Sequence, residues 1–163
     1  METNLSQQAG QVLAAMSTRF SAFPEPDVNI APFAGSWTPA QVVQHILLSL
    51  DGCLALLNGP TAATGRNPEQ HVQELRDIFL NFEEKYQSPP DIVPEEKIYD
   101  KTALSRQLDD LRRNLETAIS SHDLTRTCTT FEFPTVGYLT GIEVANFAVV
   151  HTQRHIHQLE EMQ

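Results

Sequence analysis

The sequence is poor in cysteine. It has only two, Cys53 and Cys128, among 163 residues, and neither belongs to a CxxC pair. This scarcity argues against a disulfide scaffold or a cysteine-rich zinc module, and it fits a reducing cytoplasm. A chain of this length buries roughly 70% of the surface that its unfolded form exposes, so it can hold a core without disulfides. We therefore expect one cytoplasmic domain spanning residues 1–163.

Basic side chains are also scarce. Lysine and arginine total 11 against 21 aspartates and glutamates, which gives a formal net charge of −10. An acidic surface repels phosphate backbones and anionic lipids, and the longest basic run is Arg112-Arg113. We therefore expect no nucleic-acid partner.

Long hydrophobic runs are missing as well. The most apolar stretch, Ile46–Leu57, is interrupted by Ser49, Asp51 and Gly52. It falls short of the ~20 apolar residues that span a bilayer, so we interpret it as a buried helix. The first six residues lack the basic opening and the apolar run of a secretory signal. The sequence therefore predicts neither a membrane partner nor export.

The chain does have helical periodicity. Apolar residues at spacings of three and four predict helices over about 5–20, 39–58, 67–86, 101–120 and 140–163. Capping boxes at Thr38–Gln41 and Thr140–Glu143 mark the start of the second and the last helix. Long amphipathic helices with short connections bury their apolar faces in bundles. We predict an all-α fold, a four-helix bundle with an additional helical segment.

One segment has a different composition. Residues Thr127–Phe133 are rich in threonine and phenylalanine, as strands are. The sequence shows no evident partner strand, so we expect an extended lead-in to the last helix.

The last predicted helix carries two histidines on its inward face. The residues of this face advance in steps of four and three: Val144, Ala148, His151, His155 and Leu159. Histidines one turn apart can clamp one metal ion. His45 lies in a helix that is apolar nearly all round, and a neighbouring helix could bring it opposite the pair. Three neutral imidazoles would form an open site for a divalent ion such as zinc. The alternative is a set of core histidines that are hydrogen-bonded without metal.

Two parts of the sequence resemble the DinB/YfiT-like family of metalloenzymes. The run Trp37–His45 (WTPAQVVQH) is similar to the W-S/T-P…H opening of that family's second helix. Pro134–Thr140 (PTVGYLT) and His151–Leu159 (HTQRHIHQL) are similar to its P-x-x-G-x-L-T…H-x-x-x-H-x-x-Q ending. The helical pattern between them also fits, so the resemblance covers nearly the whole chain.

The resemblance implies an up-down-down-up four-helix bundle in which His45, His151 and His155 bind one divalent metal, with zinc or nickel expected. It also implies a homodimer and a metal-dependent enzyme acting on a small molecule. Characterised relatives include thiol-dependent isomerases and S-transferases, so the metal would activate a low-molecular-weight thiol or water. The implied activity is thiol S-transferase-like or hydrolase-like.

Two further residues of the last helix are candidates for binding a cofactor or a nucleophile. Gln158 lies three residues after His155 on nearly the same face, and could bond to the second nitrogen of a histidine or to the bound nucleophile. Arg154 could hold an anionic substrate or reach an acidic neighbour.

Two other classes of function remain open. A non-catalytic metal-binding or stress-response bundle would keep the three histidines without a substrate pocket beside them. A pure interaction bundle would keep them hydrogen-bonded and free of metal.

Overall fold

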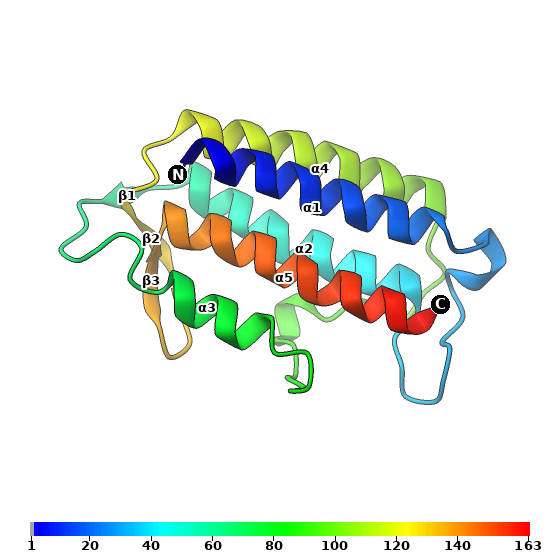
Figure 1. The fold of residues 1–163 in the computed structure, drawn as a ribbon. Helices are drawn as coiled ribbons and strands as arrows, with labels where there is room; N and C mark the ends of the chain where they lie inside the picture. The colour runs from blue at the N-terminus through cyan, green and yellow to red at the C-terminus, as the bar shows by residue number, and fades with distance from the viewer. Residues whose placement is uncertain (1) are drawn as a thin grey trace.

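The computed structural model describes residues 2–163; Met1 lies outside the described part. Four long helices form a bundle: α1 (Glu2–Ser21), α2 (Pro39–Asn58), α4 (Lys101–Ser121) and α5 (Gly141–Met162). α1 and α5 run in one direction and α2 and α4 in the other (Figure 1), which is the up-down-down-up order. α1 and α2 both pack against α4 and α5, so they lie across a diagonal. The predicted four-helix bundle is confirmed.

Two of these helices begin at the predicted capping boxes. Thr38 Oγ1 accepts a hydrogen bond from the main-chain N–H of Gln41 at 3.1 Å, and Gln41 Oε1 accepts one from that of Thr38 at 2.9 Å. Thr140 and Glu143 repeat the pattern at the start of α5. Pro39 takes the first position of α2, where an N–H would have no partner in the helix.

α2 is the core helix of the bundle. By length and composition it could cross a membrane, since its mean hydropathy is 1.5, but 67% of that stretch is buried inside the protein. A helix that is apolar all round is expected where neighbours pack on several sides. Cys53 of α2 and Cys128 are both buried and free. The prediction of a buried helix at this position is confirmed.

The third helix is shorter than predicted. α3 covers only Val72–Phe79 and packs against α5. Phe82 and Tyr86, which continue the apolar spacing, remain 37% and 54% exposed. Phe82 stacks on His157 with ring centroids 4.3 Å apart, and Tyr86 lies 5.1 Å from the Arg154 guanidinium. The two aromatic rings therefore cover polar side chains of α5 instead of entering the core, and the helix ends before them.

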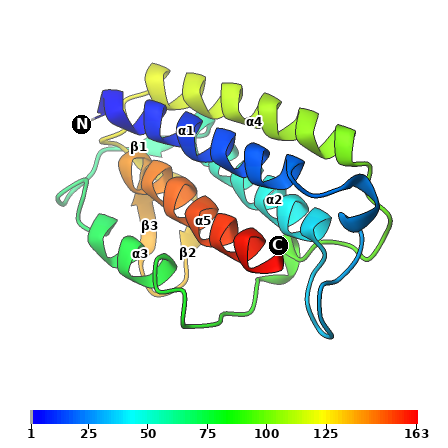
Figure 2. The ribbon, with the colours of Figure 1, turned by 45° about the vertical axis from the view of Figure 1, so that its right-hand side comes forward.

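The expectation of an unpaired lead-in before α5 was wrong. β2 (Thr127–Phe133) pairs antiparallel with β1 (Thr61–Ala62) and with β3 (Gly137–Thr140). Neither partner strand has a recognisable pattern, because β1 has two residues and β3 has four. The sheet lies at the end of the bundle where α2 ends and α5 begins (Figure 2).

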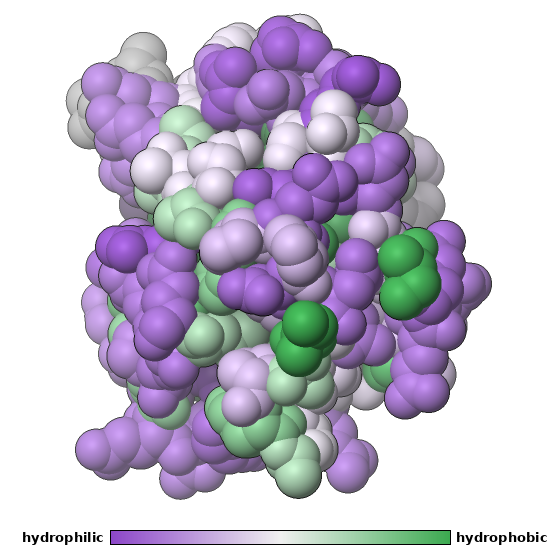
Figure 3. Space-filling view, turned by 90° about the vertical axis from the view of Figure 1, so that its right-hand side faces the viewer, coloured by the Kyte–Doolittle hydropathy of each residue, from purple (hydrophilic) through white to green (hydrophobic). Residues whose placement is uncertain are grey.

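The opposite end of the bundle has a largely hydrophilic surface. Figure 3 views this end and shows apolar residues singly or in small groups among polar ones. Two short 3₁₀ turns, η1 (Glu25–Asp27) and η2 (Pro90–Ile92), belong to the connections before α2 and α4. Of these, η2 packs against α2 and positions part of the site described next.

Candidate metal centre

Three buried histidines from two helices meet inside the bundle; we call His45, His151 and His155 the histidine cluster. His45 lies in the second turn of α2, and the other two lie on successive turns of α5, His151 at its middle and His155 in its second half. α2 and α5 pack together in opposite directions, so these parts of the helices face each other (Figure 1). All three residues are buried: His45 is 1% exposed, His151 5% and His155 9%. The structure thus brings together the three histidines that the sequence singled out.

The Nε2 atoms of the histidine cluster converge. Nε2 of His151 lies 3.2 Å from Nε2 of His45 and 3.2 Å from Nε2 of His155. One ligand atom from each residue lies within 4.8 Å of the others. Two nitrogens at about 2.0–2.1 Å from a tetrahedral zinc ion are about 3.3 Å from each other. The observed spacing therefore fits a single ion of this size, and the three side chains could hold a metal ion.

Two of the rings are oriented by acceptors on the other nitrogen. His45 Nδ1 donates to the main-chain carbonyl of Ile92 in η2 at 2.8 Å. His155 Nδ1 donates to the side-chain oxygen of Gln158 at 2.7 Å. A hydrogen bond of this kind fixes the ring and leaves the lone pair on Nε2, which is how ligating histidines are commonly supported. Gln158 therefore has the contact with a histidine that its spacing suggested.

The third ring has a different partner. His151 Nδ1 lies 3.0 Å from the hydroxyl oxygen of Ser49, and the contact is buried. Ser49 follows His45 by four residues, so both side chains lie on the same face of α2. That spacing was available in the sequence. The Ile92 carbonyl was not, because a main-chain acceptor leaves no mark on the side-chain pattern.

Burial keeps the histidine cluster neutral. Desolvation lowers the pKa of His45, although its bond to the Ile92 carbonyl acts in the opposite direction. Desolvation, with an added contribution from nearby His45, lowers the pKa of His155 to about 3. The pKa of His151 falls well below its usual value, mainly through desolvation and then through the two other rings. Neutral imidazole is the form that binds metals, so the donor set is ready at neutral pH.

Aromatic rings line the histidine cluster. Trp37 lies 5.1 Å from the ring of His45, measured between centroids. Phe79 of α3 and Phe147 of α5 lie 5.3 and 5.0 Å from the ring of His151. These apolar side chains cover one side of the rings and contribute to their desolvation.

The comparisons with known proteins agree with this architecture. A family model described as the DinB superfamily matches residues 8–159. This chain belongs to the DinB superfamily. One solved structure with the same fold is YfiT from Bacillus subtilis, described as a probable metal-dependent hydrolase with an unusual four-helix bundle topology. It matches with a TM-score of 0.64 and 19% sequence identity, over 99% of this chain and 85% of YfiT. A comparison with curated proteins gives no match.

The motifs that resembled the DinB family have local structural roles in this DinB protein. In the first, Trp37 packs on the ring of His45, and Thr38 caps the helix that carries it. In the second, Gly137 has a φ of +86°, a left-handed conformation that favours glycine, where the chain turns from β2 into β3. Thr140 then caps α5. Both motifs thus fix the starts of the two helices that carry the histidines.

Arg154 holds the segment that follows α3. Its guanidinium donates to the main-chain carbonyls of Phe79 at 3.4 Å, Asn81 at 2.9 Å and Glu84. The ring of Tyr86 lies 5.1 Å from the same group. The segment is thereby attached to α5 beside the histidine cluster. Binding of an anionic substrate by Arg154 stays a prediction.

Glu143, at the start of α5, is a buried carboxylate that forms an ion pair with Arg66, and the sequence did not predict this pair. Glu143 accepts hydrogen bonds from Arg66 at 2.7 and 2.9 Å, from the main-chain N–H of His71 at 2.7 Å and from that of Thr140 at 2.9 Å. Burial alone raises the pKa of Glu143, but Arg66 and these N–H donors outweigh burial and lower it. The carboxylate therefore joins the segment before α3 to α5.

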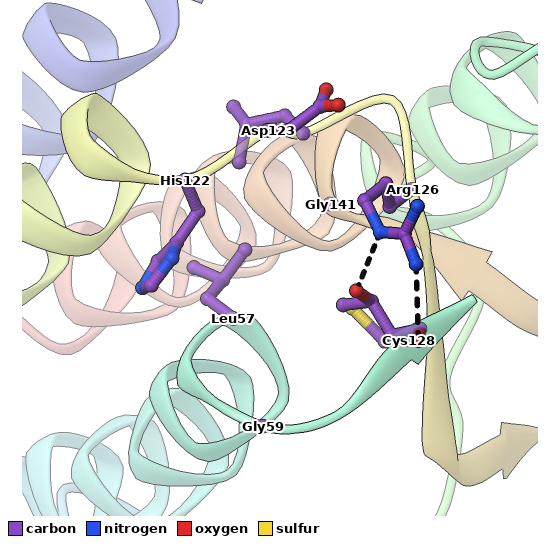
Figure 4. A pocket seen from close by; sticks show the side chains of 9 residues that line it. Leu57, Gly59, His122, Asp123, Arg126, Cys128 and Gly141 are labelled. Carbon is purple, nitrogen blue, oxygen red and sulfur yellow. Dashed lines mark hydrogen bonds between the residues drawn. The ribbon is translucent and has the colours of Figure 1, made fainter. Parts of the chain in front are cut away.

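A separate cavity of about 180 Å³ lies near the sheet (Figure 4). Its polar groups are paired: Arg126 donates to the Thr61 hydroxyl at 2.8 Å, and His122 Nε2 lies 2.7 Å from the side-chain oxygen of Asn58. Leu57, which lines the cavity, is 12 residues past His45, or about 18 Å along the axis of α2. This cavity is therefore not part of the histidine cluster.

Proposed function

We propose that this DinB protein is a metal-dependent hydrolase whose divalent ion, zinc or nickel, is held by Nε2 of His45, His151 and His155. The observation that carries the proposal is the convergence of three neutral, buried Nε2 atoms, with Nε2 of His151 lying 3.2 Å from each of the other two. Three protein ligands leave a position for a reactant, as catalytic sites do and closed structural sites do not. The description of YfiT as a probable metal-dependent hydrolase supports the same class of activity.

When bound, such an ion supplies Lewis acidity, which polarises a substrate oxygen and makes water or a thiol more acidic near neutral pH. The chain's own residues orient and shield this site. The Ile92 carbonyl and the Gln158 amide hold two of the ligand rings through Nδ1. Phe79 and Phe147 keep water from one side of His151, and a less polar surrounding strengthens electrostatic interactions with a reacting group.

The remaining expectations are part of the same proposal. A small-molecule substrate, a low-molecular-weight thiol as the alternative nucleophile and a homodimer follow from the DinB resemblance. A cytoplasmic location is favoured by the two free cysteines. The net charge of −10 disfavours nucleic acid and anionic membranes as partners.

Metal analysis tests the proposal directly. Protein purified without a metal-scavenging affinity tag is expected to contain about one zinc or nickel ion per chain. His45→Ala, His151→Ala and His155→Ala should each lose most of this metal, because two imidazoles hold an ion far less well than three. His122→Ala is the matched control, since its ring bonds to Asn58 on the surface. Equal metal content in all five proteins would overturn the proposal.

A second measurement separates the possible uses of the site. In cobalt-substituted protein, azide or a small thiol that enters the position left by three protein ligands should change the visible spectrum. Hydrolysis of ester or amide substrates that depends on added metal supports the hydrolase. Thiol binding together with metal-dependent thiol transfer supports the S-transferase instead. Stoichiometric metal with neither spectral change nor turnover supports the non-catalytic metal-binding bundle.

A further inference from the structure

Two rings of the histidine cluster each have one possible proton position. A main-chain carbonyl can only accept a hydrogen bond, so His45 must carry its hydrogen on Nδ1, which faces the Ile92 oxygen. The Gln158 amide presents its oxygen to Nδ1 of His155, and with this orientation of the amide the hydrogen of His155 is on Nδ1 as well. The Nε2 atoms of both rings therefore present lone pairs to His151.

His151 has to meet these two lone pairs. Its Nε2 lies 3.2 Å from each of them. If Nε2 of His151 also carried a lone pair, three lone pairs would face one another with no hydrogen between them. They would repel one another, and a buried site screens this repulsion poorly. In the metal-free protein, His151 is therefore expected to carry its hydrogen on Nε2, with Nδ1 as an acceptor. The Ser49 hydroxyl, 3.0 Å away, is placed to donate to that Nδ1.

A metal ion bound by the same Nε2 needs the opposite arrangement. The lone pair must then be on Nε2 and the hydrogen on Nδ1, so His151 loses one proton from Nε2, gains one on Nδ1 and stays neutral. Its Nδ1–H needs an acceptor. A serine hydroxyl has one hydrogen and two lone pairs, so it can donate in one state and accept in the other, which a carbonyl oxygen cannot do. Its own hydrogen is then available to the carbonyl one helical turn earlier, a common partner for serine in a helix.

We propose that Ser49 is the positioning residue that serves both tautomers of His151 and so lets the histidine cluster exist with and without metal. The metal-loaded half of this inference rests on the proposed metal centre. The residue touches neither substrate nor metal; it acts through the ring of His151.

The tautomers can be read without any variant. In ¹⁵N-labelled protein, long-range ¹H–¹⁵N correlation spectra distinguish a protonated from an unprotonated ring nitrogen. His45 and His155 are expected to carry hydrogen on Nδ1 in both the chelator-treated and the zinc-loaded protein. His151 is expected to carry it on Nε2 without zinc and on Nδ1 with zinc. Hydrogen on Nδ1 of His151 in the chelator-treated protein would overturn the inference.

Variants at position 49 give an independent readout. Ser49→Ala leaves the Nδ1–H of His151 without its acceptor in the loaded state, and losing such a partner typically lowers metal affinity by about 10- to 100-fold. Ser49→Thr keeps the hydroxyl and should restore most of the zinc affinity. Ser121→Ala is the matched control, because that hydroxyl donates only within its own helix, to the Thr117 carbonyl.

The outcomes separate this inference from the proposed function. Zinc binding by the wild type with unchanged affinity in Ser49→Ala overturns the role of Ser49 and leaves the metal centre standing. Binding of neither zinc nor nickel by the wild type overturns both.

Discussion

Acid is expected to unfold the metal-free protein over a pH range set by its buried histidines. In the unfolded chain a histidine titrates near pH 6.5, whereas burial lowers the pKa of His155 to about 3 in the folded protein. Below pH 6.5 the unfolded state therefore binds a proton that the folded state does not, and stability falls as pH falls. Well above pH 6.5 this ring does not make the free energy of unfolding depend on pH. Between about pH 6.5 and pH 3 the free energy of unfolding decreases progressively as the pH falls.

The magnitude follows from the size of the window. Each pH unit below 6.5 costs about 1.4 kcal/mol per histidine that stays neutral in the folded state, so His155 alone accounts for about 2 kcal/mol at pH 5. The lowered pKa values of His45 and His151 act in the same direction and add to this loss. The lowered pKa of Glu143 acts at more acid pH, below the usual range of a carboxylate.

Urea unfolding followed by circular dichroism at pH 7.5, 6.5 and 5.0 measures this effect in chelator-treated protein. The free energy of unfolding should drop between pH 6.5 and 5.0 by at least the contribution of His155. His155→Gln, which removes the titrating ring, should be less stable at pH 7.5 but lose about 2 kcal/mol less over the same interval. A pH-independent stability of the wild type, or the same pH dependence in the variant, would refute the account of neutral buried rings.

Three further outcomes are expected. Chelation should leave the helical circular dichroism spectrum intact, since the apolar faces pack without metal; loss of helicity would instead indicate a structural site. Zinc at 100 times its dissociation constant should raise the free energy of unfolding by about 2.7 kcal/mol. Glu143→Ala leaves Arg66 and two main-chain N–H groups without their acceptor. In urea unfolding it should lower the free energy of unfolding by about 3 kcal/mol. Glu116→Ala breaks the more exposed pair with Arg112 and should lower it by under about 1 kcal/mol. Arg154→Ala should speed hydrogen exchange in the segment after α3 while leaving the metal content unchanged, and loss of metal in this variant would contradict the role given to Arg154.

The parts of the fold that the sequence predicted are those specified by side-chain periodicity. α2 and α5 begin at capping boxes whose residues are fixed in type and spacing, and their apolar faces repeat over five turns or more. The prediction failed where the pattern was short or ambiguous. Phe82 and Tyr86 continue the spacing of α3, but each ring instead covers a polar side chain of α5, and only the tertiary structure distinguishes these two uses of an aromatic residue.

The histidine cluster shows the same division at the level of single atoms. The three histidines could be singled out from the spacing of His151 and His155 and from the occurrence of His45 in an apolar helix, because each is a side chain on a predictable helix face. Their supports differ in kind. Gln158 and Ser49 lie at helical spacings from a histidine and could be found by asking which polar residue shares its face. The Ile92 carbonyl comes from a connection between helices, where no periodicity operates, and its contact with His45 follows only from the path of the chain. A cluster built mostly from helix faces is therefore predictable in its residues, and the orientation of their side chains is predictable only where the supporting groups are side chains as well.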